Sequence, residues 1–334
     1  MKWNKEKNIV EFQIKILLLS FVVTAALGII IIPILKRLKV GQIERSDGPE
    51  SHLSKQGTPT MGGIILILAI AILTVLAFGY YIGDEPDVAH RLLPILLISS
   101  GFGLVGLVDD AKKLILKNTE GLKPAYKMFG LLIMSVAYVL YLVNFVHIGT
   151  DTYIPFLKTY INLGLPIYII FSIFVILGTT NAVNLTDGVD GLATSVSTII
   201  ITCLTVIGII YNVKEVAVFG SIVTGACLGF LLFNMNPAKI FMGDTGSLLL
   251  GGVIAGMAIY LKMPLLLLLI AIIPVIETIS VIMQVVYFKK TGNRIFKMAP
   301  LHHHFELSGW NENKVVSIFS IITLIVCIIG LNVI

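Results

Sequence analysis

The stretch ILLLSFVVTAALGIIIIPIL, at residues 16–35, decides the fold because it runs for twenty positions without a charged side chain. A helix needs about 20 apolar residues to cross the hydrocarbon core of a bilayer. Backbone groups find no hydrogen-bond partners in lipid, so a spanning stretch of this kind is helical. Lys36 and Arg37 follow it with no small-residue cleavage site, which favours a retained membrane helix over a removed signal peptide.

Nine further apolar stretches predict an all-α polytopic membrane protein with about ten transmembrane helices. They cover residues 62–83, 92–108, 127–146, 161–182, 192–212, 216–234, 245–261, 263–288 and 315–334. The composition agrees, because 57% of the 334 residues are hydrophobic and only 13% are charged, which excludes a soluble globular protein with an ordinary polar surface. We interpret residues 1–334 as a single integral membrane domain.

The basic residues predict the orientation of these helices. The loops after the odd-numbered helices carry sixteen Lys and Arg residues, and the other side carries eight. The positive-inside rule therefore places the richer loops in the cytoplasm and both termini outside. Lys2, Lys5, Lys7 and Lys15 of the amino-terminal segment oppose this orientation. Because the basic residues flank membrane segments, the net charge of +5 does not indicate a nucleic-acid partner.

Polar residues gather in the same basic loops, beginning with KQGTPTMGG at residues 55–63. A run of Gly, Thr and Lys at the start of a helix suits anion binding, because free backbone N–H groups and the helix dipole point at the ligand. An ordinary loop would have a similar composition. Asp109 and Asp110 come next, at the end of the third apolar stretch. Adjacent carboxylates at a membrane boundary indicate a metal ligand or a general base, or else a solvated helix end near Lys112 and Lys113.

The segment NAVNLTDGVDG, at residues 181–191, closes one apolar stretch and opens the next with no basic residue nearby. Asn181, Asn184 and Asp187 are spaced three apart and share one face if the helix continues that far. Uncompensated carboxylates in such a place favour a cation or the hydrogen-bond donors of a ligand.

A further acidic motif, FMGDTGS, lies at residues 241–247, shortly after Asn234. Asp244 or Thr245 could simply be the N-cap of the following helix. Several oxygen ligands without cysteine instead favour a hard cation such as Mg²⁺.

The last motif, PLHHHFE at residues 300–306, contains three consecutive histidines. Adjacent residues do not converge easily on one ion, so the pattern favours imidazoles that contact phosphate or a polar substrate group over a zinc site. Two other features have structural explanations. GFGLVG, at residues 101–106, matches a dinucleotide fingerprint but lies within an apolar helix, so it indicates helix packing. Glu277 lies deep in an apolar stretch, where a functional role and a buried pairing role are both open.

Together the five motifs resemble, in sequence order, those of the phospho-N-acetylmuramoyl-pentapeptide transferases, the bacterial family that makes lipid I for peptidoglycan. The acidic motifs are similar to those of the wider superfamily of polyprenyl-phosphate N-acetylhexosamine-1-phosphate transferases, whereas the triple histidine is typical of the muramoyl-pentapeptide branch. The resemblance spans nearly the whole chain. It implies ten helices in the bacterial inner (plasma) membrane, outside termini and a cytoplasmic active site.

The resemblance also implies a reaction that requires Mg²⁺. Phospho-MurNAc-pentapeptide would move from UDP-MurNAc-pentapeptide to undecaprenyl phosphate, giving lipid I and UMP. Charge neutralisation and positioning should dominate such phosphoryl chemistry. Direct attack and a covalent aspartyl intermediate both remain open.

Site residues follow from the same resemblance. Asp244 would be the leading magnesium ligand, with Asp110 near it, and Asp109 a candidate base toward the lipid phosphate. Gln284 and its loop would meet the peptide, and five lysines after Asp110 compete for a role. The residues expected around the nucleotide are Asn181, Asn184, Asp187, Gly188, Asp190, Asn234 and Phe241, the last of these stacking on uracil. The expected phosphate or sugar contacts are Lys55, Thr60, Lys127, His302, His303 and His304.

Two other functions compete with this one. A transferase for UDP-GlcNAc would share the acidic motifs, but the histidine loop argues against it. A transporter would line a path across the mid-bilayer with charges, whereas only Glu277 lies deep. Small residues such as Gly251, Gly252 and Gly256 are compatible with a homodimer contact and equally with internal helix packing.

Overall fold

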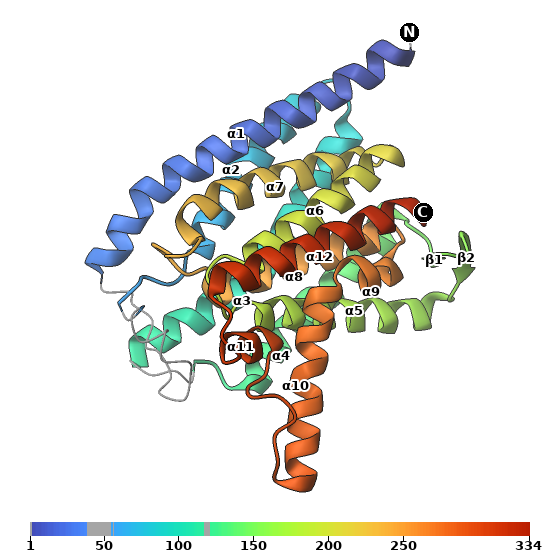
Figure 1. Cartoon of the computed structure of the whole chain (residues 1–334). Helices are drawn as coiled ribbons and strands as arrows, with labels where there is room; N and C mark the ends of the chain where they lie inside the picture. Colours follow the sequence, from blue (N-terminus) through green and yellow to red (C-terminus); the bar gives the residue numbers. More distant parts are fainter. Residues whose placement is uncertain (1, 39–54, 56, 117–120) are drawn as a thin grey trace.

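The computed structural model describes residues 2–38, 55, 57–116 and 121–334, and it is almost entirely helical (Figure 1). Its elements are α1 Lys2–Arg37, α2 Gly63–Tyr81, α3 Pro86–Leu116, α4 Pro124–Tyr141, the π-helix η2 Leu142–Val146, β1 Asp151–Ile154, β2 Thr159–Asn162, α5 Leu165–Thr186, α6 Leu192–Ile210, α7 Lys214–Asn234, α8 Gly243–Tyr260, the 3-10 helix η3 Pro264–Leu266, α9 Leu267–Ile270, α10 Ile272–Thr291, α11 Leu301–Glu306 and α12 Glu312–Asn332. Of the basic residues counted for orientation, Lys39, Arg45 and Lys117 lie outside the described residues, as does Gln56 of the first motif.

The prediction of ten membrane helices is confirmed. Within the described ranges, ten helices are long and apolar enough to cross a bilayer. An even number of crossings returns the chain to the side on which it started. In Figure 1 the N label lies at the upper right and the C label at the middle right, both at the end of the bundle opposite the α7–α8 connection.

α8 forms the centre of the bundle, with 89% of its membrane window buried. Its glycines let neighbouring helices approach closely, because a Cβ atom at Gly251 would lie 2.6 Å from the Cα of Thr180 and one at Gly252 would overlap the Phe102 ring. A Cβ at Gly256 would meet the Tyr138 ring at 3.2 Å. Internal packing thus accounts for these glycines, and a homodimer stays a prediction.

The third helix is longer than its apolar stretch. α3 continues to Leu116, so Asp109 and Asp110 lie inside the helix with only 3% of each residue exposed. The alternative that they form a solvated helix end is therefore wrong. The hydropathy pattern predicted a helix end at residue 108, because a carboxylate lowers the hydropathy of a segment even where it is buried.

The ninth apolar stretch, predicted as one helix over 263–288, is divided into η3, α9 and α10. Pro264 begins the 3-10 turn and Ala271 leaves helical geometry with φ −102° and ψ 31°. Pro274 lies in the first turn of α10, where a missing N–H costs little. After this break α10 points away from the bundle (Figure 1).

A short antiparallel hairpin, β1–β2, precedes α5 and corrects the predicted helix start at residue 161. Gly164, at φ 68°, ends the hairpin segment and Pro166 lies in the first turn of α5. The hairpin holds the carboxyl end of the chain, because Lys158 Nζ donates to the carbonyls of Asn332 and Ile334.

Candidate active site

The site forms where α3 crosses the start of α8. A Cβ at Gly106 would overlap the carbonyl of Asp244, and one at Gly103 would lie 3.2 Å from the carbonyl of Thr245. These contacts confirm that the glycines of GFGLVG serve helix packing. One turn beyond Gly106, α3 presents Asp109 and Asp110 to the amino-terminal end of α8.

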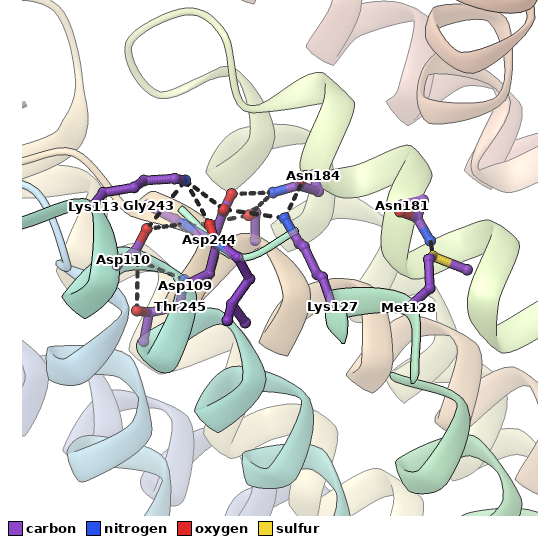
Figure 2. Close-up of polar contacts among 12 residues, drawn as sticks. Asp109, Asp110, Lys113, Lys127, Met128, Asn181, Asn184, Gly243, Asp244 and Thr245 are labelled. Atoms are coloured by element: carbon purple, nitrogen blue, oxygen red, sulfur yellow. Dashed lines mark hydrogen bonds and ion pairs between the residues drawn. The ribbon is translucent and has the colours of Figure 1, made fainter. Parts of the chain in front are cut away.

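Three carboxylates meet there. Asp109, Asp110 and Asp244 each offer an oxygen, and these oxygens lie within 4.8 Å of one another. Lys113 holds the group together, because its Nζ lies 2.7 Å from Asp109 Oδ2, 2.7 Å from Asp244 Oδ2 and 3.8 Å from Asp110 Oδ1. Figure 2 shows this ammonium group above the three aspartates. Oxygen ligands of this kind suit a hard divalent cation such as Mg²⁺.

Asp244 has two further partners from neighbouring helices. Lys127 Nζ of α4 lies 3.0 Å from Asp244 Oδ2, and Asn184 Nδ2 of α5 donates to Asp244 Oδ1 over 2.6 Å (Figure 2). Asn184 also donates to Ser247 Oγ at 2.8 Å. The apolar stretch predicted to end at residue 182 continues as helix to Thr186, which carries the Asn184 amide to the cluster and leaves Asp187 as the C-cap residue.

Asp110 caps α8 from outside its own helix. Its carboxylate accepts from the backbone N–H groups of Asp244 (3.2 Å) and Thr245 (2.9 Å) and from Thr245 Oγ1 (2.7 Å). The N-cap residue of α8 is Met242, without a side-chain cap, so the alternative N-cap role for Asp244 or Thr245 is wrong. The helix dipole favours an anion here, which makes the charged form of Asp110 easier to bury.

The segment after α5 adds a second group of carboxylates. Burial and the charges of Asp244, Asp110 and Asp190 raise the pKa of Asp187 to about 8. Asp190, in contrast, has a cationic partner, because its Oδ1 accepts a hydrogen bond from Lys55 Nζ at 2.8 Å. Lys55, expected to contact phosphate or sugar, thus lies beside an expected nucleotide contact.

The motif at residues 241–247 lies against the motif at residues 55–63 and is joined to it by main-chain hydrogen bonds. Phe241 N–H donates to the Pro59 carbonyl (2.8 Å) and the Phe241 carbonyl accepts from Gly62 N–H (2.9 Å). Thr60 Oγ1 lies next to Gly243, 3.0 Å from where a Cβ would be. Asn234 is buried, accepts from Thr194 Oγ1 and donates to the Ile240 carbonyl, so it shapes the loop leading to Phe241.

Two expected contacts are used elsewhere in this structure. Asn181 Nδ2 donates to the Leu177 carbonyl at 2.7 Å and lies beside Met128, apart from the carboxylates (Figure 2). Gln284 fixes the loop after α10, because it accepts from the N–H groups of Ile295 and Phe296 at 3.0 Å and donates to the Phe296 carbonyl.

The three histidines on α11 have different surroundings. His302 is 1% exposed, and its backbone N–H donates to Glu277 Oε1 at 3.2 Å, so the pairing alternative for Glu277 is the one the structure shows. The His302 ring lies over the same carboxylate, with Nδ1 3.3 Å from Glu277 Oε2. A Cβ at Gly188 would overlap His302 Nε2. His303 Nδ1 lies 2.8 Å from Glu306, and His304 Nδ1 accepts from the Lys297 N–H.

Sequence reasoning missed two functional candidates, Lys113 and Thr245. Lys113 was one of five competing lysines, and its spacing of four from Asp109 and three from Asp110 could have selected it, because residues so spaced share a helix face. Thr245 was considered only as a cap. Its bond to Asp110 joins positions 135 apart in sequence, and no local pattern signals such a contact.

Comparison with known proteins agrees with the geometry. Residues 92–262 match the family model for glycosyl transferase family 4, and residues 55–67 match signature 1 of the phospho-N-acetylmuramoyl-pentapeptide-transferases. Proteins with that name are 52% identical over 316 residues in Clostridium perfringens (strain 13), covering 94% of this chain and 96% of the relative, and 50% identical over 314 residues in Clostridium botulinum (strain Alaska E43), covering 94% of each. A third, from Acetivibrio thermocellus, is 46% identical over 334 residues, covering 99% of this chain and 97% of the relative. The chain therefore belongs to glycosyl transferase family 4 and, within it, to the phospho-N-acetylmuramoyl-pentapeptide-transferases.

Proposed function

We propose that this chain is a single-domain, multi-pass bacterial membrane enzyme that transfers phospho-MurNAc-pentapeptide from UDP-MurNAc-pentapeptide to undecaprenyl phosphate. An oxygen of the lipid phosphate bonds to the phosphorus attached to the sugar, and the bond from that phosphorus to the bridging oxygen breaks. The products are lipid I and UMP. Identity of about 50% over 94% of the chain to transferases of this name supports the proposal.

The observation that carries the proposal is the convergence of five distant motifs. The motif at residues 55–63 pairs with the motif at 241–247 through Pro59 and Phe241. The Asp109–Asp110 motif pairs with the same motif through Asp110 and Thr245. Asn184 joins the motif at residues 181–191 to the one at 241–247. The histidine motif at residues 300–306 packs on the motif at 181–191 where His302 meets Gly188. Motifs separated by more than two hundred residues thus form one site.

Asp244, Asp110 and Asp109 fit a magnesium ion by their donor chemistry and mutual distance. When bound, the ion supplies positive charge that stabilises the charge of phosphate oxygens. Asp244 and Asp110 would hold it, since Asp244 lies in the first turn of α8 and the Asp110 carboxylate caps that turn. The remaining work falls to side chains of this chain.

Asp109 is proposed as the base toward the lipid phosphate. Its Oδ1 accepts from Leu122 N–H at 2.7 Å and its Oδ2 contacts Lys113, so both oxygens are oriented before substrate arrives. Lys113 and Lys127 contribute ammonium groups that can pass from Asp244 to phosphate oxygens. Such preoriented charges lower the cost of reorganisation during phosphoryl transfer.

The test is release of UMP by detergent-purified protein given undecaprenyl phosphate, Mg²⁺ and either UDP-MurNAc-pentapeptide or UDP-GlcNAc. Asp244→Asn keeps the volume of the side chain but removes a charged ligand, and we expect it to lower kcat by about 100- to 1,000-fold, by analogy with the loss of other electrostatic groups in active sites. Asp151→Asn is the matched control, because Asp151 lies on the hairpin and pairs with Lys262.

Release from the MurNAc donor alone, lost in Asp244→Asn and retained in Asp151→Asn, is the expected result. Release from UDP-GlcNAc instead would move the chain to another branch of the superfamily. Transport of the nucleotide sugar into liposomes without UMP release would support the transporter alternative and overturn the proposal.

The orientation in the membrane is part of the same proposal. The excess of Lys and Arg, sixteen against eight, supports an active site in the cytoplasm with both termini outside. A cysteine introduced at Phe156, an exposed residue of the hairpin, should react with a membrane-impermeant maleimide in intact spheroplasts. One introduced at exposed Lys123 should react only after lysis, and the reverse pattern would invert the topology.

A further inference from the structure

Glu312, in the first turn of α12, is joined to three loops that lie far from it in the sequence. Its Oε2 atom lies 2.7 Å from Lys55 Nζ, accepts from Asn236 Nδ2 at 3.2 Å and accepts from the Asp190 N–H at 3.4 Å. One carboxylate oxygen therefore connects segments that precede α2, follow α5 and follow α7.

Asp190 closes the same network from the other side. Its Oδ1 receives Lys55 at 2.8 Å, and its Oδ2 accepts from Asn236 Nδ2 (3.2 Å) and the Ala238 N–H (3.0 Å). The side chains of Lys55, Asp190 and Glu312 are only 12%, 3% and 11% exposed. Hydrogen bonds within a network this buried are stronger than on a solvated surface, because the local dielectric is low.

Lys55 is held in its charged form by these two partners. Burial lowers the pKa of Lys55, but its hydrogen bonds with Asp190 and Glu312 outweigh that effect, so the pKa is raised. An ammonium group has three N–H donors. Two of them meet the carboxylates of Asp190 and Glu312, and within the described part of the chain the third is left for an acceptor on a substrate.

The network adjoins the residues expected to surround the nucleotide. Asn234 lies two positions before Asn236 and leads into Phe241, and Asp187 lies three positions before Asp190. If Glu312 fixes Lys55 and both loops, it controls the shape of the nucleotide site without being part of any of the five motifs.

We propose that Glu312 is a positioning residue for the nucleotide end of the donor substrate, acting by aiming the third N–H donor of Lys55 and by tying the loops at Asp190 and Asn236. The inference rests on the proposed function. Loss of the carboxylate charge should weaken binding of UMP and of the UDP donor, while the carboxylate cluster at Asp244 keeps its contacts.

The experiment compares Glu312→Gln with the wild type for UMP release over a range of UDP-MurNAc-pentapeptide concentrations, and for UMP binding by calorimetry. Gln retains the volume and one acceptor oxygen, which keeps the risk of misfolding low. We expect KM for the donor and Kd for UMP each to rise about tenfold, which is about 1.4 kcal/mol, with kcat within about twofold of the wild type. Glu312→Asp should recover part of the loss.

Asn311→Ala is the matched control. The Asn311 side chain caps α12 by accepting from the Lys314 N–H at 2.8 Å, so its loss weakens the helix start but leaves the Glu312 carboxylate in place. A Lys55→Met/Glu312→Gln double variant completes a cycle, in which the second change should add little once the first is made.

Unchanged UMP affinity in Glu312→Gln, an equal loss in Asn311→Ala, or strict additivity in the cycle would each overturn the positioning role. Calorimetry keeps this failure separate from that of the proposed function. A wild type that binds UMP but releases none from UDP-MurNAc-pentapeptide would refute the reaction, while the effect of Glu312→Gln on UMP binding would still decide the inference.

Discussion

Replacing Lys113 by methionine removes the ammonium group that contacts all three carboxylates. At 2.7 Å and an effective dielectric constant of ~20, each close contact with Asp109 and Asp244 corresponds to a Coulomb energy of about 6 kcal/mol before desolvation is subtracted. Removing one partner of a buried pair costs about 3–5 kcal/mol. The Lys113 side chain is 33% exposed, so a value near the low end, about 3 kcal/mol, is expected for the metal-free protein.

That loss should be visible in thermal unfolding. At about 2.1 cal/mol/K per residue, the unfolding entropy of a 334-residue chain is about 0.7 kcal/mol/K. A loss of about 3 kcal/mol should therefore lower the Tm of metal-free Lys113→Met by about 4 °C relative to the wild type. Mg²⁺ should then stabilise the variant more than the wild type, because the cation no longer competes with an ammonium group for the same oxygens. Half-maximal stabilisation is expected at about tenfold lower Mg²⁺, a difference of ~1.4 kcal/mol.

Lys123→Met serves as the control, since Lys123 is exposed and is the N-cap residue of α4, four residues before Lys127. It removes the same net charge from the same side of the protein. If Lys113→Met and Lys123→Met give the same Tm without metal and the same Mg²⁺ midpoint, then Lys113 does not neutralise the cluster and the reasoning is refuted.

Two further outcomes test the segment after α5. Gly188→Ala should lower Tm and reduce UMP release at least ~10-fold, because the new Cβ would overlap the buried His302 ring. Gly178→Ala is the control and should leave both quantities unchanged, because the space around Gly178 is open. Equal behaviour of the two variants would show that the contact between residue 188 and His302 is unimportant. With a pKa of about 8 in the folded chain against 3.8 as the ordinary value, Asp187 binds a proton that the unfolded chain has lost, so metal-free stability should fall as pH rises from about 4 to about 8. Asp187→Asn should flatten that fall in Tm, and an unchanged pH profile would contradict the raised pKa.

The membrane fold was predictable from hydropathy, because lipid demands long apolar helices and their number can be counted. The errors in the helix boundaries arose where the polarity of a residue does not match its burial in the fold. Asp109 and Asp110 looked like a helix end, since a carboxylate is costly in an apolar helix, yet the amino-terminal end of α8 and Lys113 compensate for it. The division at Ala271 escaped detection because every residue around it is apolar.

The candidate site was predictable residue by residue only through the resemblance. Asp244, Asn184 and Lys127 were expected to act in one site, and the structure brings them within hydrogen-bond or ion-pair distance. The connections to Glu312 could not be found from sequence, because Lys55 and Glu312 are 257 positions apart. A single acidic residue in the first turn of a helix is also expected from the helix dipole alone.

Charge balance explains why distant segments meet at the start of α8. Three carboxylates within 4.8 Å repel one another, so the chain must bring positive charge to them before it can bury them. Asp110 accepts hydrogen bonds from backbone N–H groups at the start of α8, and Asp244 forms ion pairs with Lys113 and Lys127. Both substrates of the proposed reaction are anionic, and they need the same lysines. The ammonium groups that stabilise the ligand-free fold are therefore already placed where phosphate oxygens must bind, which couples the stability of this site to its chemistry.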